Sequence, residues 1–185
     1  MTLTAPREIR SEEIVLRRLT VDDIEAFGDF MARPENTRFM TFPDEVKNRD
    51  AAAEIVRDTI KTYTTPTASM ALAICRPEDP KMIGACGAYQ TSEHTIEVFF
   101  LVFEAHRNRG YATQAARALV GHLRAAHPAH DLTAVVDPRN DRSPRILERL
   151  GFHDRGDTAL DGRPGRCFAL AAASATPNDT REDRP

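Results

Sequence analysis

The chain has few cysteines, no excess of either charge and no long apolar run, and each absence excludes a class of protein. It holds 3 cysteines and 6 histidines in 185 residues, and neither set has the spacing of a metal motif, so we expect no metal site. The net charge of −3 argues against direct binding of nucleic acid. No apolar stretch approaches the roughly 20 residues that span a bilayer, so we expect no membrane insertion.

The start of the chain is polar and lacks the apolar centre of a signal peptide. Cys75 and Cys86 lie in apolar, strand-like runs, where a buried thiol is expected. These features predict a reduced, cytoplasmic protein. The length fits one domain with a sizeable core, and 41% apolar and 29% charged residues are typical of soluble globular proteins.

We divide the chain into a lead of residues 1–13, a domain of residues 14–170 and a tail of residues 171–185. The tail is rich in alanine, proline and charge, and we expect it to be disordered. Within the domain, apolar periodicity and turn residues predict an α/β fold with a mostly antiparallel sheet. The expected strands span 14–19, 69–75, 82–89, 95–103, 132–136, 152–155 and 166–170, and the expected helices begin near 20, 48, 112 and 143.

Two local patterns refine this reading. Thr20 and Asp23 have the spacing of an N-capping pair at the start of the first helix. Gly84 and Gly87 interrupt the strand 82–89, which predicts a bent or bulged strand.

The most informative stretch joins the strand 95–103 to the long helix by a tight basic turn. Backbone N–H groups in such a turn and in the first helical turn lack partners, and the helix dipole adds positive charge there. Gly110 permits a positive φ, Ala112 keeps the first turn free of bulk, and Arg107 and Arg109 add charge. The segment therefore predicts a phosphate or pyrophosphate site, with a turn whose arginines are only solvated as the alternative.

These motifs, in this order, resemble those of the GNAT acetyltransferase superfamily, in particular its RimJ/RimL-like branch of ribosomal-protein N-terminal acetyltransferases. The turn fits the family signature R/Q-x-x-G-x-G/A after the fourth strand. An asparagine after the fifth strand and a Leu-Gly-Phe helix end also match, as does an N-terminal Leu-Arg-x-Leu strand before an acidic helix start. The matching residues are Arg107 to Ala112, Asn140, Ser143, Leu150 to Phe152, Leu16 to Leu19, Asp22 and Asp23.

The resemblance implies a GNAT fold and acetyl-CoA as the acyl donor. The pyrophosphate would lie on the turn residues, namely Arg107, Asn108, Arg109, Gly110, Tyr111 and Ala112. The pantetheine arm would pair with backbone at Leu101, Val102 and Phe103. Asn140 and Ser143 would line the far side of the thioester cleft, although Asn140 also suits a helix cap.

For catalysis, the resemblance points to Glu97 as the general base, with Glu104 as a weaker choice, although a strand carboxylate can equally be solvated or paired. A backbone N–H near Val102 would meet the charge that develops on the carbonyl oxygen. Many relatives use a tyrosine as the acid where this chain has Leu147. Ser143, Asn140 or water would have to replace it.

The acceptor is an amine, and three readings stay open. The first is a protein or peptide N-terminal α-amine, and the second is a small amine or antibiotic. The third is an acyl-CoA-binding domain without turnover, which the absence of the tyrosine favours. Phe39, Met40 and Phe42 are candidates for the acceptor wall, and a homodimer is left open as the assembly.

Overall fold

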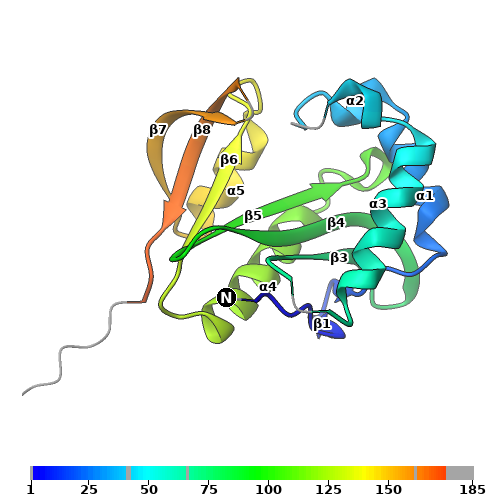
Figure 1. The fold of residues 1–185 in the computed structure, drawn as a ribbon, viewed down its shortest axis with the longest axis horizontal. Coiled ribbons are helices and arrows are strands. Elements are labelled where there is room, and N and C mark those ends of the chain that lie inside the picture. The colour runs from blue at the N-terminus through cyan, green and yellow to red at the C-terminus, as the bar shows by residue number, and fades with distance from the viewer. Residues whose placement is uncertain (1, 41–42, 66, 161, 174–185) are drawn as a thin grey trace, which may run out of the picture.

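The computed structural model describes residues 2–40, 43–65, 67–160 and 162–173 (Figure 1). Its helices are α1 (Asp23–Met31), α2 (Pro34–Thr37), α3 (Arg49–Thr62), α4 (Tyr111–Ala126) and α5 (Arg142–Arg149), with short 3-10 turns η1 (Asp44–Val46) and η2 (Glu104–His106). Its strands are β1 (Glu8–Arg10), β2 (Val15–Arg17), β3 (Ser69–Arg76), β4 (Asp79–Ser92), β5 (Thr95–Val102), β6 (Asp131–Val136), β7 (His153–Leu160) and β8 (Arg163–Leu170).

The strands form one sheet in the order β1-β2-β3-β4-β5-β6-β8-β7. All neighbours are antiparallel except β5 and β6, so the predicted meander and the mixed, mostly antiparallel sheet are confirmed. The parallel pair follows from α4, because a helical crossover returns the chain to the same edge in the same direction.

The sheet carries an apolar core on each face. The amphipathic helix α4 packs on one face, where Ala115, Leu119 and Leu123 are buried against β3, β4 and β5. Helices α1 and α3 cover the other face, with Phe27, Met31 and Val56 in its core.

The sequence prediction missed strand β1, which lies inside the expected lead of residues 1–13. Ile9 pairs with Leu16, and Leu3 bridges to Thr67. Leu3 and Ala5 are buried in the core on the α4 face. The lead thus contributes to the sheet and the core; three-residue strands are too short to show a clear alternating pattern.

Strands β5 and β6 separate soon after they meet (Figure 1). Their pairing runs only from Thr95↔Asp131 to Glu97↔Thr133, whereas β5 continues to Val102 and β6 to Val136. Beyond Glu97, the edge of β5 that faces β6 therefore pairs with no strand in the described ranges, and this fork positions the site described below.

Both glycines of β4 lie where an added Cβ would meet a backbone carbonyl, at Gly84 that of Leu101. A register shift lies between Ile74 and Arg76, next to the pair Ile74↔Gly84, so the predicted irregularity occurs at that end of the strand. Gly87 pairs regularly, and the absence of a side chain makes room for its neighbours. An added Cβ would lie 2.2 Å from the Met70 carbonyl oxygen and 2.6 Å from the Phe99 ring. Gly87 thereby lets the Phe99 ring lie close over β4.

Asp23 begins α1, and its carboxylate accepts a hydrogen bond from the Thr20 N–H at 2.8 Å, one half of the predicted capping pair. The same carboxylate accepts two hydrogen bonds from Arg17, both at 2.8 Å, and Asp23 is only 2% exposed. Arg17 also donates to the Pro80 carbonyl. This ion pair, together with the bond to Pro80, joins β2, α1 and the start of β4.

Phe42 and residues 174–185 of the expected tail lie outside the described residues. Before that point, the Ala172 N–H donates to Asp131 and the Ala173 N–H donates to the Pro128 carbonyl. Among the helices of the described ranges, none combines the length and the apolar character that a membrane crossing requires.

Candidate active site

The turn before α4 presents a row of free backbone N–H groups. Gly110 has φ +82° and immediately precedes α4, and Asn108 is also left-handed with φ +62°. No side chain caps the helix, and no described residue accepts a hydrogen bond from the N–H groups of residues 108–113. Together with the helix dipole, these donors form an anion-binding concavity of the kind that the sequence predicts.

The two arginines of the turn have different positions. Arg107 lies along the inner side of the turn: its Nε donates to the Val102 carbonyl at 3.2 Å and an Nη donates to Asn36 at 3.1 Å. Arg107 therefore ties the turn to β5 and α2. Arg109 is exposed and is available to an anion at the helix start.

The open edge of β5 directs its polar groups into the fork. Phe103 donates its N–H to the Ile83 carbonyl on β4. Because successive residues of an antiparallel strand point their polar groups to opposite sides, the N–H and C=O of Val102 face away from β4. The Val102 N–H is thus available at the open edge, next to the anion-binding turn.

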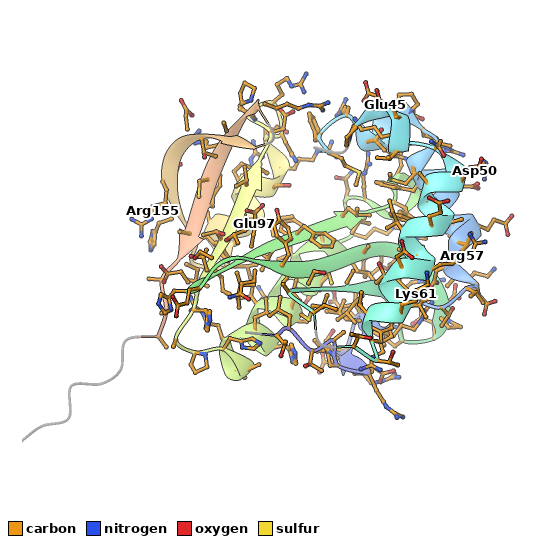
Figure 2. All side chains as sticks on the ribbon, in the orientation of Figure 1. Glu45, Asp50, Arg57, Lys61, Glu97 and Arg155 are labelled. Carbon is orange, nitrogen blue, oxygen red and sulfur yellow. The ribbon has the colours of Figure 1, made fainter. Side chains whose placement is uncertain are left out.

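Glu97 lies at the point where β5 and β6 separate, and its side chain projects into the cleft (Figure 2). It is 8% exposed, and the Tyr89 hydroxyl, directly opposite on β4, donates to its carboxylate at 2.5 Å. A carboxylate in this position has both a strong donor and access to the cleft. Glu104 is exposed on η2 and does not line the cleft in the described part of the chain.

Asn140 and Ser143 lie together at the start of α5. The Asn140 side-chain carbonyl accepts the N–H of Arg142 at 3.2 Å and that of Ser143 at 3.3 Å, which is the capping role anticipated for it. Its amide donates to the Ser143 hydroxyl oxygen at 3.0 Å. Both residues line the cleft beside Leu147, whose side chain is buried.

The cleft has a volume of about 1030 Å³ and lies between β5, β6 and helix α3. Most of its lining is apolar, and it includes Phe39 and Met40. Among the described residues that line it, every charged side chain is acidic, namely Glu54, Asp58, Glu97 and Asp137. An apolar cleft with carboxylates suits a molecule that carries an amine.

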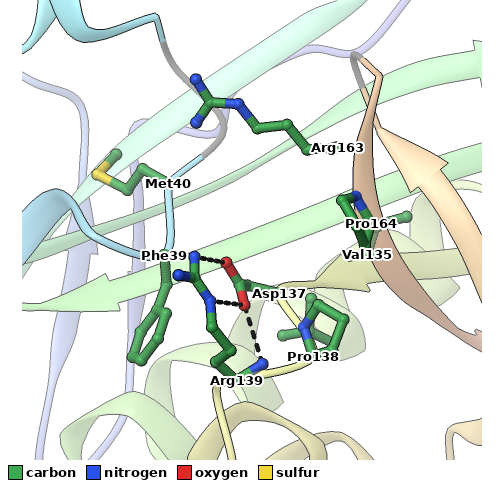
Figure 3. Close-up of a pocket in the computed structure, with 10 residues that line it drawn as sticks. Phe39, Met40, Val135, Asp137, Pro138, Arg139, Arg163 and Pro164 are labelled. Carbon is green, nitrogen blue, oxygen red and sulfur yellow. Dashed lines mark hydrogen bonds and ion pairs between the residues drawn. The ribbon is translucent and has the colours of Figure 1, made fainter.

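A second cavity of about 550 Å³ adjoins the cleft (Figure 3). The two share part of their wall, namely Phe39, Met40, Val135, Val136 and Asp137. Asp137 accepts two side-chain hydrogen bonds from Arg139, at 2.9 and 2.6 Å, and these keep the pKa of the Asp137 carboxyl below its usual value. Arg163 stands on the other side of this cavity.

Comparison with known proteins identifies the family. A model of the acetyltransferase (GNAT) domain matches residues 13–153. The chain belongs to the GNAT family. It is thus one of the acyl-CoA-dependent acetyltransferases, and the free N–H groups of the turn and the open edge of β5 suit coenzyme A.

Individual relatives are distant. The chain is 22% identical to "Uncharacterized N-acetyltransferase p20" of Bacillus licheniformis, over 79% of this chain and 82% of p20. It is 32% identical to "Probable N-acetyltransferase YjcK" of Bacillus subtilis, over 42% of this chain, and the match spans 45% of YjcK.

The fold is shared with RimL, the ribosomal L7/L12 α-N-protein acetyltransferase, whose structure was solved in complex with coenzyme A. The TM-score is 0.75 at 15% identity, over 90% of this chain and 98% of RimL. This likeness confirms the GNAT fold.

Two residues near the site escaped the sequence prediction, namely Tyr89 and Arg163. Tyr89 lies eight positions before Glu97, and only the register of β4 against β5 brings them together. Arg163 begins β8, and only the pairing of β8 with β6 brings it to a cavity. Asn108 was predicted as part of the turn, and its left-handed conformation is one that asparagine tolerates.

Proposed function

We propose that the protein transfers the acetyl group of acetyl-CoA to the α-amine of a peptide or protein N-terminus. The observation that carries the proposal is the position of Glu97. Its carboxylate lies at the fork between β5 and β6, in a cleft whose lining is mostly apolar and whose charged residues are acidic. The open edge of β5 leads from this fork to the turn before α4. The turn residues Arg109 to Ala112 would hold the pyrophosphate through their N–H groups. Leu101 to Phe103 would pair with the pantetheine arm.

The choice of an α-amine follows from acid–base chemistry. An amine attacks a thioester only in its neutral form, and an α-amine has a pKa near ~8 whereas a lysine has one near ~10.4. An α-amine therefore requires less help from a base. RimL, which shares the fold, is by its name an α-N-protein acetyltransferase of ribosomal L7/L12, and this supports the same class of acceptor.

Glu97 would take the proton that the amine loses. Glu97 lies five positions before Val102, or about 17 Å along a strand, which is beyond the reach of a single bridging water, so a chain of several ordered waters would have to relay the proton. Tyr89 holds one carboxylate oxygen in place. The Val102 N–H would stabilise the oxygen that becomes negative during attack.

Ser143 is the best-placed donor for the departing thiolate, because Leu147 has no proton to give. The Asn140 amide donates to the Ser143 hydroxyl oxygen, which leaves the hydroxyl hydrogen free to be donated elsewhere. Asn140 would thus orient Ser143 and also cap α5.

The test is thiol release from acetyl-CoA with a panel of N-terminal peptides, internal lysine peptides with blocked N-termini, and small amines. Turnover with free N-terminal peptides alone is the expected result. Turnover with small amines alone would move the assignment to a small-molecule acetyltransferase. Absence of turnover in a sample that binds CoA by calorimetry would favour a binding domain.

A further inference from the structure

The cavity beside the cleft carries a positive charge, on Arg163, that no ion pair with another described residue neutralises. Arg139 is held by Asp137, so these two charges offset each other. Arg163 makes no ion pair with any residue in the described ranges. Asp44 is close enough to feel its charge, but the Asp44 carboxylate is hydrogen-bonded to Lys47 at 2.7 Å.

The walls of this cavity are apolar apart from those charges. Phe39 and Met40 form one side, and Pro138 and Pro164 lie on the other (Figure 3). At its floor, an added Cβ on Gly165 would lie 2.7 Å from a Val135 methyl group, so β8 packs directly on β6. Arg163 is exposed, so a carboxylate here would form a charge-assisted hydrogen bond with it that water partly screens.

The cavity lies beside the acidic cleft, because Phe39, Met40 and the residues from Val135 to Asp137 line both. The two neighbouring cavities differ in charge: Glu97 lines the cleft and Arg163 lines the second cavity. A molecule that spans both should carry an amine at one end and a carboxylate farther along.

Strand geometry sets the spacing. Val136 pairs with Arg166, and Arg163 lies three residues beyond it, or about 10 Å along β8. An extended peptide advances about 3.3–3.6 Å per residue. When the α-amine lies in the part of the cleft beside Val136, an acidic side chain two to four residues from the N-terminus would therefore reach Arg163.

We propose that the cavity beside the cleft is a specificity subsite for acceptor peptides with Asp or Glu at one of positions 2–4, with Arg163 as the residue that binds the carboxylate. The proposal rests on the proposed function, since it assumes a peptide α-amine in the cleft. It names a feature of the acceptor that family membership leaves open.

The test uses the full chain and hexapeptides with a free N-terminus that carry Asp, Asn or Lys at position 2, 3, 4 or 6. We expect kcat/KM to be about fivefold higher for Asp than for Asn at one of positions 2–4, and equal at position 6. Arg163→Glu should reverse the preference in favour of Lys. Arg155→Glu is the matched control, because Arg155 is an exposed arginine on the outer strand β7, and it should keep the wild-type preference (Figure 2).

A further assay, with free aspartate as the acceptor, distinguishes an amino-acid acceptor from a peptide acceptor. Turnover of aspartate that depends on Arg163 would overturn the peptide spacing. Equal kcat/KM for Asp and Asn peptides, or an unchanged preference in Arg163→Glu, would overturn the subsite but leave the proposed acetyl transfer intact.

Binding gives a readout that is independent of catalysis. Fluorescence anisotropy of labelled Asp and Asn hexapeptides, with the label at the C-terminus and CoA present, should show the same preference and its loss in Arg163→Glu. Selective binding without turnover would support the subsite and overturn the proposed reaction. If the peptides show no binding and no turnover, both the subsite and the proposed reaction are overturned.

Discussion

At the scale of single residues, the proposed chemistry rests on the pair of Glu97 and Tyr89. A carboxylate that is 8% exposed and accepts a hydrogen bond at 2.5 Å is fixed in orientation, which is what proton transfer through ordered water requires. The family resemblance made Glu97 a candidate from the sequence, and its role as a base stays a prediction. The sequence could not identify Tyr89, because the partnership depends on a cross-strand register.

We expect Glu97→Gln to lower kcat by at least about 100-fold and to leave CoA affinity unchanged, because the amide keeps the shape and loses the base. Steady-state kinetics with an accepted peptide measures kcat, and calorimetry measures the affinity for CoA. Tyr89→Phe should cause a smaller loss in kcat, since the carboxylate remains but is held less firmly. Glu104→Gln is the matched control and should behave as wild type; unchanged turnover in Glu97→Gln would remove Glu97 from the mechanism.

The thiols of Cys75 and Cys86 should be inert in the folded protein. Burial raises the pKa of Cys75 to about 11 and shifts that of Cys86 higher still, so few thiolates exist at pH 8. We expect iodoacetamide at pH 8 to modify the half-buried Cys167 first, and all three cysteines only after denaturation. Mass spectrometry of the labelled peptides measures this, and early labelling of Cys86 would contradict its placement in the core.

At the scale of elements, the turn and α4 act as one unit. The sequence predicted the turn because Gly110, the flanking arginines and the apolar period of α4 are all local signals. A Cβ added to Gly110 would have no atom within 4 Å, so a side chain would not clash there. Glycine is needed instead for the backbone angle φ of +82°. Side chains with a branched Cβ adopt that conformation only under strain.

Gly110→Val should therefore weaken CoA binding by at least about tenfold, because strain in the turn would rotate its N–H groups so that they no longer point at one bound phosphate. Gly110→Asn should bind more tightly than the valine variant, since asparagine tolerates the left-handed region. The matched control is Gly121→Ala, an open glycine in the same helix, which should keep CoA affinity and stabilise the fold by about 0.5–1 kcal/mol. Equal CoA affinity for wild type and Gly110→Val would contradict the anion-binding role of the turn.

At the scale of the whole molecule, the sequence predicted what depends on local pattern and missed what depends on long-range pairing. The meander, α3, α4 and the parallel crossover were predictable from periodicity, capping and link length. The pairing of β1 with β2 and the extension of β7 and β8 to eight residues each were not, since β7 is polar along its length and obtains its strand form from β8. The adjoining cavity likewise exists only because the sheet brings residues near 39, 137 and 163 together.

The same long-range logic makes Asp23 a support for the entire fold. Its carboxylate binds Arg17 twice and accepts the Thr20 N–H just before α1, and Arg17 in turn donates to the Pro80 carbonyl at the start of β4. Asp23→Ala would leave the guanidinium, whose side chain is 20% exposed, without its carboxylate. Because breaking a buried pair is costly and Arg17 keeps some contact with water, we expect a loss of about 2–3 kcal/mol in the free energy of unfolding.

Urea denaturation measures the loss, and Asp22→Ala is the matched control, since Asp22 is exposed and its side chain makes no cap hydrogen bond. The Asp23→Ala protein that remains folded should bind CoA as wild type does, because the described partners of Asp23 and Arg17 do not include the turn before α4. Equal urea midpoints for the two variants would show that the pair contributes no net stability.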